Sequence, residues 1–290
     1  MSRFFVESLG GDFDSLALRD DDAGSRAELA PGRGGMLTGL RVGGDELLYL
    51  DPESLADVRR NVRGGNPVLF PTPGKLVEDR WQRGGASGWL KQHGFGRALP
   101  WEVVATGVDH GAWARLRLSS SERTRPNWPW EFQTDFTYRL QGNCVRIEID
   151  VRNNDSKPMP FGVGFHPYFL VPQAQKAQTV VGTPATRGLD NRTGETVAFR
   201  GLDLDGDEVD MHLGDHGATW APLRRPDRDR AVVVTGSEAF THWVVWTLAG
   251  KDFVCVEPWT CPGDAMNSGD RLLRCEPGQS VGLWLTISYQ

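Results

Sequence analysis

Apolar and polar residues alternate through long stretches of the chain, which is the pattern of β-strands with one buried face. Val145, Ile147, Ile149 and Val151 are each followed by a charged residue. The same alternation runs through three further segments, at residues 112–118, 132–140 and 281–287. Successive side chains of a strand point to opposite faces, so these segments predict antiparallel strands with one side on a core.

Other segments predict strands that are covered on both faces. Residues 231–234 and 243–246 are apolar throughout. Turn-forming residues separate the predicted strands, most clearly at Asn153–Asp155 and Pro277–Gly278. Short strands at this spacing, without alternating helices, predict an all-β fold, either a large sandwich or a barrel.

One short helix is predicted after residue 51. Asp51 is a favourable N-cap, and Pro52 occupies the first turn, where its missing N–H costs nothing. Leu55, Val58 and Val62 would then share one face. The pattern therefore predicts a helix across residues 52–62.

The composition favours one large β-rich unit. The chain has 290 residues, 39% of them hydrophobic, with 35 Gly, 18 Pro, 11 Trp and 13 Phe. Glycine and proline favour turns, and aromatic residues favour strands. No linker, repeat or low-complexity tract divides the sequence, so we expect a single domain over residues 1–290.

Charge and cysteine usage narrow the class of partner. The 32 Lys and Arg residues against 38 Asp and Glu residues leave no basic surplus of the kind usual in nucleic-acid-binding proteins. No segment approaches the roughly 20 apolar residues of a membrane span, and the N-terminal residues lack a signal-peptide core. The four scattered cysteines, without CxxC spacing, predict reduced thiols in a cytoplasmic protein. The acidic triplet Asp20–Asp22 predicts a solvated turn.

Candidate chemistry is concentrated in two apolar segments. His166 lies among aromatic residues and precedes a proline, and Glu257 follows an apolar strand-like run and also precedes a proline. Taken alone, such a histidine is more often a core residue, and such a carboxylate is often half of a salt bridge at the rim. Together, an imidazole and a carboxylate in half-dry surroundings are the usual parts of proton-transfer chemistry.

Two further polar segments are candidates for ligand binding. His93 and Arg97 flank a Gly-Phe-Gly loop, and Arg63 and Lys75 stand at the ends of a segment rich in glycine and proline. The cations in the second segment could anchor a polyol or a phosphate. The alternative for both segments is an ordinary turn or strand with charged rims.

The sequence gives little support for a metal site. Asp203–Asp207 resembles the start of a calcium loop, but Glu208 stands where that loop needs glycine. His212 and His216 have i,i+4 spacing, but a glycine between them argues against the helix that a zinc pair would need. We therefore expect no metal and no cofactor.

Four segments together resemble the aldose 1-epimerase (galactose mutarotase-like) family: Gly65–Pro71, His93–Arg97, Pro158–Phe169 and Val256–Thr260. The resemblance covers most of the chain and implies a β-supersandwich of mostly antiparallel strands with few short helices. It implies that His166 is the general acid and Glu257 the general base of a mutarotase. It also implies that His93 and Asp210 bind sugar oxygens.

The substrate class stays open at this point. Lys75 stands where many relatives carry arginine, whereas Arg63 and Arg97 resemble the branch that acts on hexose 6-phosphates. The stretch around Glu257 resembles the branch that acts on free sugars. The hypotheses are an aldose 1-epimerase, a hexose-6-phosphate mutarotase, or a non-catalytic carbohydrate-binding protein, acting as monomer or homodimer. Trp128 and Trp130 would serve the last as sugar platforms, although core packing is the alternative that we favour for them.

Overall fold

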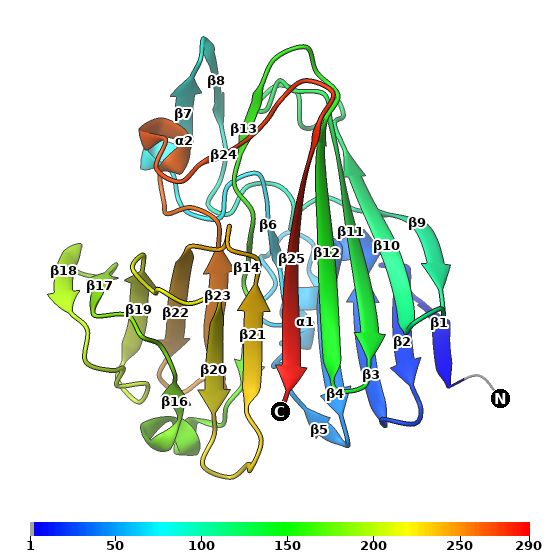
Figure 1. The fold of residues 1–290 in the computed structure, drawn as a ribbon, viewed down its shortest axis with the longest axis vertical. Helices are drawn as coiled ribbons and strands as arrows, with labels where there is room; N and C mark the ends of the chain where they lie inside the picture. Colours follow the sequence, from blue (N-terminus) through cyan, green and yellow to red (C-terminus); the bar gives the residue numbers. More distant parts are fainter. Residues whose placement is uncertain (1–2) are drawn as a thin grey trace.

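The computed structural model describes residues 3–290, and these residues form layers of antiparallel β-sheet (Figure 1). The first sheet has the order β1 (Phe4–Gly10), β2 (Ser15–Asp20), β3 (Ser25–Ala30), β4 (Met36–Val42) and β5 (Asp45–Glu46). The second has the order β16 (Val180–Val181), β20 (Trp220–Arg224), β21 (Val232–Gly236), β25 (Ser280–Tyr289), β12 (Cys144–Asn153), β11 (Phe132–Gln141), β10 (Ala112–Ser119) and β9 (Glu102–Gly107).

The third sheet carries the candidate site. Its order is β18 (Glu195–Ala198), β17 (Arg187–Asp190), β19 (Glu208–Leu213), β22 (His242–Leu248), β23 (Phe253–Trp259), β14 (Gly164–Phe165) and β6 (Val68–Leu69), and β15 (Tyr168–Leu170) also pairs with β23. Two small sheets are formed by β7 (Arg80–Arg83) with β8 (Ala86–Trp89) and by β13 (Met159–Phe161) with β24 (Leu273–Cys275). The helices are α1 (Pro52–Ala56), α2 (Ala265–Ser268) and three 3₁₀ turns at Pro31–Arg33, Val77–Asp79 and Gln173–Gln178. The predicted all-β class is confirmed.

The second sheet contacts both of the other large sheets. One half of it, around β10 and β11, packs on β1 to β3 of the first sheet, and β21 in its other half packs on β23 of the third (Figure 1). Because β23 lies against this layer on one face, its other face is available to build a site.

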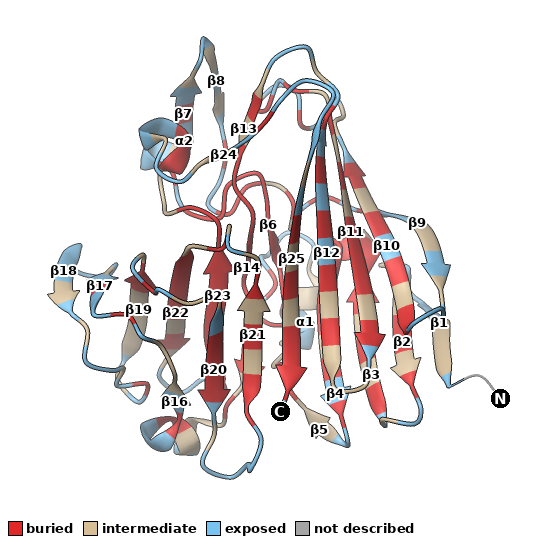
Figure 2. Ribbon diagram, viewed as in Figure 1, coloured by how far each residue is buried: buried red, intermediate tan, exposed pale blue. Residues whose placement is uncertain are grey.

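The alternating segments fold as predicted. Val145, Ile147, Ile149 and Val151 are buried in β12 and belong to the main hydrophobic cluster, and the charged residues between them face outward (Figure 2). Trp128 and Trp130 also belong to this cluster, with ring centroids 4.7 Å apart, so they pack in the core rather than serving as surface platforms. In the described part of the chain the four cysteines are free thiols, and no helix is long and apolar enough to cross a membrane.

The predicted helix is shorter than expected. Asp51 caps α1 through a hydrogen bond from the Glu53 amide, but the helix ends at Ala56. The guanidinium of Arg33 donates to the carbonyl oxygens at positions 55, 57 and 60, at 3.0, 2.9 and 2.7 Å. A tertiary contact therefore satisfies the carbonyls that would otherwise continue the helix.

The prediction for the acidic triplet is wrong for its first residue. Asp20 is fully buried, with its carboxylate 2.7 Å from the Arg3 guanidinium. It also accepts a hydrogen bond from the Gly142 amide at 2.8 Å. A buried carboxylate is tolerated here because the fold brings a cation and a backbone donor to it.

Candidate active site

A cavity of about 490 Å³ lies over strands β19, β22 and β23. Side chains of a strand alternate between faces, and in β23 Val254 and Val256 enter the main hydrophobic cluster, while Glu257 and Trp259 line the cavity. Glu257 pairs in register with Val244 of β22, another cavity-lining residue. The third sheet therefore separates the core from the cavity.

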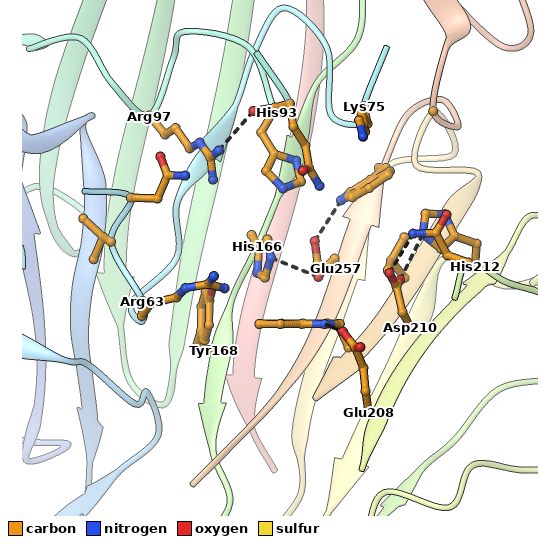
Figure 3. A pocket seen from close by; sticks show the side chains of 18 residues that line it. Arg63, Lys75, His93, Arg97, His166, Tyr168, Glu208, Asp210, His212 and Glu257 are labelled. Carbon is orange, nitrogen blue, oxygen red and sulfur yellow. Dashed lines mark hydrogen bonds and ion pairs between the residues drawn. The ribbon is translucent and has the colours of Figure 1, made fainter. Parts of the chain in front are cut away.

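All seven residues singled out in the sequence line this cavity (Figure 3): Arg63, Lys75, His93, Arg97, His166, Asp210 and Glu257. They come from strands and loops that are far apart in the chain. The fold therefore brings the four candidate segments to one place.

His166 and Glu257 face each other at the centre of the cavity. His166 Nε2 lies 3.3 Å from Glu257 Oε1, and the other carboxylate oxygen accepts a hydrogen bond from the Trp259 indole at 3.2 Å. The imidazole stacks on Tyr168 at a centroid distance of 4.6 Å, and its Nδ1 is buried without a protein partner among the described residues. The pair is therefore held between aromatic rings with little freedom to rotate.

Burial shifts both groups toward their neutral forms. Glu257 is 1% exposed, and desolvation, followed by the nearby Asp210 charge, raises its pKa well above the usual value of a glutamate. His166 is 8% exposed, and desolvation, followed by His93 and Arg97, lowers its pKa well below that of an ordinary histidine. The low polarity of the site therefore favours one proton shared by the pair over two separate charges.

His93 lies beside this pair and is held neutral. Its backbone has a φ of 72°, and its Nδ1 hydrogen-bonds with the Pro73 carbonyl. The ring meets that of His166 edge to face at 5.5 Å. Burial, followed by the Arg97 charge, lowers its pKa to about 3. With Nδ1 donating to the carbonyl, Nε2 is left as the ring's hydrogen-bond acceptor.

The three cations come from loops that line the cavity, and in Figure 3 Arg63 and Arg97 lie on one side while Lys75 lies beyond His93. Arg63 and Lys75 are exposed and Arg97 is half-buried. Arg63 lies over the Trp246 ring at 5.4 Å, and Arg97 donates to the Gln92 carbonyl at 3.0 Å. None of the three cations forms a salt bridge with a residue that the structure describes. Their charges are therefore available to a ligand.

The opposite side carries a carboxylate whose partners were missed in the sequence. Asp210 lies 3.2 Å from His212 Nε2 and accepts a hydrogen bond from Asn191 at 2.7 Å. Burial pushes the pKa of Asp210 up, but the hydrogen bonds from His212 and Asn191 outweigh it and lower the pKa below the usual value. The alternation of polar and apolar residues in 208–213 would have placed His212 on the face of Asp210.

The geometry bears on metal binding at two places. His216 does not join His212, because its ring stacks on Trp243 and its Nδ1 lies 2.9 Å from the Ala218 carbonyl. Elsewhere in the described residues, ligand atoms of His166, Cys255 and Glu257 lie within 4.8 Å of one another. Imidazole, thiolate and carboxylate are ligands that zinc accepts, so these three are the residues that could hold such an ion.

The chain matches a known family over nearly its whole length. The model of the family described as aldose 1-epimerase matches residues 16–288. The solved structure of the Slr1438 protein from Synechocystis sp. PCC 6803 is 39% identical, covers 95% of both chains and superposes with a TM-score of 0.92.

Two more distant proteins are similar to the whole chain or to part of it. A galactose mutarotase-like protein from Clostridium acetobutylicum is 20% identical over 99% of both chains, with a TM-score of 0.85, which shows a common fold. A Salmonella typhimurium protein named "Putative glucose-6-phosphate 1-epimerase" is 29% identical over 137 residues, which is 47% of this chain and 42% of that protein.

Proposed function

The chain belongs to the aldose 1-epimerase family, and from this premise we propose that it interconverts the α and β anomers of an aldose. The observation that carries the proposal is the buried contact of His166 Nε2 with Glu257 Oε1, 3.3 Å apart on the cavity wall. Opening a cyclic hemiacetal needs one group to remove a proton and one to supply it. An imidazole and a carboxylate in one cavity meet that need.

In the proposed mechanism, Glu257 takes the proton of the C1 hydroxyl while His166 donates a proton to the ring oxygen. The C1–O5 bond breaks, and the C1 hydroxyl becomes the aldehyde. Rotation about the C1–C2 bond presents the other face of the carbonyl, and the two residues reverse their roles as the ring closes. The number of protons on the pair is the same before and after, so the reaction needs no exchange with solvent.

The protonation of the His166–Glu257 pair refines this mechanism. Catalysis in the direction written needs a proton on His166 and a charge on Glu257, whereas burial favours the neutral arrangement of the same single proton. Moving that proton between the two residues interconverts the two forms. Sugar hydroxyls that hydrogen-bond to the carboxylate and the imidazole would favour the charged form.

Polarimetry on freshly dissolved α-glucose and α-galactose tests the proposal. We expect anomer exchange well above the uncatalysed rate, and a fall in kcat of about 10²–10⁴-fold in H166A and in E257Q. The exposed surface change E276Q is the control and should leave the rate unchanged. Sugar binding by calorimetry without anomer exchange would instead favour a carbohydrate-binding protein, and unchanged rates in both variants would refute the assigned roles.

A hexose 6-phosphate is the second candidate substrate. Arg63 and Arg97 lie on one side of the cavity, Lys75 lines it as well, and none of the three has a carboxylate partner among the described residues; phosphate groups are bound well by such cations. The partial similarity to the Salmonella protein points the same way. The ratio of kcat/KM for glucose 6-phosphate to that for glucose decides between the two substrate classes.

A further inference from the structure

Behind the cavity, Asp210 is the first member of a chain of three polar side chains. Asp210 Oδ1 lies 3.2 Å from His212 Nε2, and His212 Nδ1 lies 3.2 Å from His242 Nε2. Asp210 and His212 are on β19, and His242 begins the neighbouring strand β22. The two histidines are 9% and 7% exposed. Of these three side chains, Asp210 and His212 line the cavity and His242 does not, so His242 lies behind the other two.

The chemistry of the three groups sets the direction of these hydrogen bonds. An ionised carboxylate only accepts, so His212 must donate to Asp210 from Nε2. A neutral imidazole with its proton on Nε2 can only accept at Nδ1. Beside a neutral His212 of this tautomer, His242 donates from its own Nε2, which leaves its Nδ1 without a proton.

The far end of the chain favours the same direction. Arg271 Nη1 donates to the carbonyls of Gly214 and Thr241, at 2.6 and 3.1 Å, which holds its charge next to the start of the strand that carries His242. A lone pair near a positive charge is favourable, whereas an N–H near it is not. Burial, the largest cause, lowers the pKa of His242 to about 3, so its ring stays neutral.

The two histidines also pack on the tryptophan that holds the proposed base. His212 meets the Trp259 ring edge to face at 5.3 Å, and His242 stacks on it at 6.0 Å with an interplanar angle of 25°. Trp259 donates to Glu257. The histidine pair is therefore linked to two of the carboxylates that line the cavity, to Asp210 through a hydrogen bond and to Glu257 through the Trp259 indole.

We propose that His242 is a positioning residue: by donating to His212 Nδ1 it fixes the tautomer in which His212 donates to Asp210. Asp210 is thereby held as an oriented acceptor for a neutral sugar hydroxyl, at the end of the cavity opposite Arg63 and Arg97 (Figure 3). The inference rests on the proposed function because it assigns Asp210 to the substrate. It adds a selection rule, since an acceptor at this end rejects an anionic group.

Kinetics of three variants test the role of this N–H. H242F keeps an aromatic ring on Trp259 but removes the donor. It should raise KM about tenfold with kcat within about twofold, which is the size expected when a sugar hydroxyl loses its hydrogen bond to the charged Asp210. H242Q keeps an amide N–H where Nε2 lies and should return KM to within about twofold of the parent. H216F is the matched control, because His216 is also buried and stacked on a tryptophan but lies outside the chain.

Equal KM values in H242F and the parent would overturn the proposal, and so would equal losses in H242F and H242Q, since restoring an N–H at this position would then have no effect. A second measurement does not depend on mutarotase activity. Long-range ¹H–¹⁵N correlation spectra of ¹⁵N-histidine protein at pH 7 report the protonated nitrogen of each ring. We expect His212 and His242 as neutral Nε2–H tautomers. A doubly protonated or Nδ1–H His212 would refute the chain even if the protein had no activity at all.

Discussion

The two sides of the cavity hold their polar groups in different ways. On the sheet side, Glu257 and Asp210 stand on strands and accept hydrogen bonds from Trp259, His212 and Asn191. On the loop side, Arg63 and Lys75 are exposed, and neither forms a salt bridge within the described residues. One side is ordered before a ligand arrives, and the other is free to adjust to it.

The difference indicates which part of a substrate each side would serve. Strand register holds facing side chains within about 4.5–5.5 Å of each other, which suits the hemiacetal and hydroxyl groups that all aldoses share. Loops accept changes more readily and carry much of the specificity of enzymes. The loop side is therefore where the choice between a free and a phosphorylated sugar would be made.

The largest effect should come from breaking the ordered side. D210N keeps the shape of the side chain but replaces a charged acceptor with an amide, so kcat/KM should fall about tenfold to a hundredfold for every substrate. Polarimetry with glucose and glucose 6-phosphate measures both values, and D203N, an exposed change, is the control. A loss confined to one substrate would show that Asp210 serves specificity and not general sugar binding.

A smaller and more selective effect is expected on the loop side. R63A removes an exposed cation and should lower kcat/KM for glucose 6-phosphate about tenfold while leaving glucose within about twofold. Arg60 is exposed three residues away, so R60A is a matched control for the loss of one positive charge. If R63A slowed both substrates equally, Arg63 would belong functionally with the ordered side.

Salt should separate the two sides further. Exposed charges are screened at high ionic strength, because the Debye length shrinks from about 10 Å at 0.1 M to about 3 Å at 1 M. KM for glucose 6-phosphate should therefore rise about threefold or more over this range, whereas KM for glucose should change little. Potassium chloride titrations in the two assays measure this, and a parallel rise for both sugars would contradict it.

The smallest change is expected from pH near neutrality. The active pair holds one proton: a second is added only well below pH 6.5, because the pKa of His166 is depressed, and the first leaves only well above pH 4.5, because the pKa of Glu257 is raised. The acid limb of the kcat/KM profile should thus be displaced below pH 6.5. An acid limb at about 6.5 would indicate a histidine titrating as if in water.

The sequence predicted much of this site because its signals were local. Alternation located the strands, and apolar flanks marked His166 and Glu257 as residues in dry surroundings. The same alternation in residues 208–213 predicts that His212 and Asp210 lie on one face of a strand. In the sequence, His212 was considered only for its i,i+4 spacing to His216, whose ring contacts the Ala218 carbonyl instead. Because these residues form a strand, the spacing of two residues identifies the partner of Asp210, and the helical spacing of four residues does not.

Other features left no local signal. His242 precedes an apolar run, and nothing in its neighbourhood points to His212, 30 residues earlier. The early end of α1 depends on Arg33, and the burial of Asp20 depends on Arg3 and Gly142. Each of these contacts joins segments whose proximity exists only after the sheets have paired.

What the amino-acid sequence determined by itself is the strand pattern, the candidate acid and base, and the family to which they belong, because period-two alternation and short motifs are written in consecutive residues. What only the tertiary structure decided is the protonation and the support of the site. Desolvation of the His166–Glu257 pair and the hydrogen bonds from Asp210 to His242 depend on which side chains meet across strands, and that is set by sheet register and packing rather than by any neighbour in sequence.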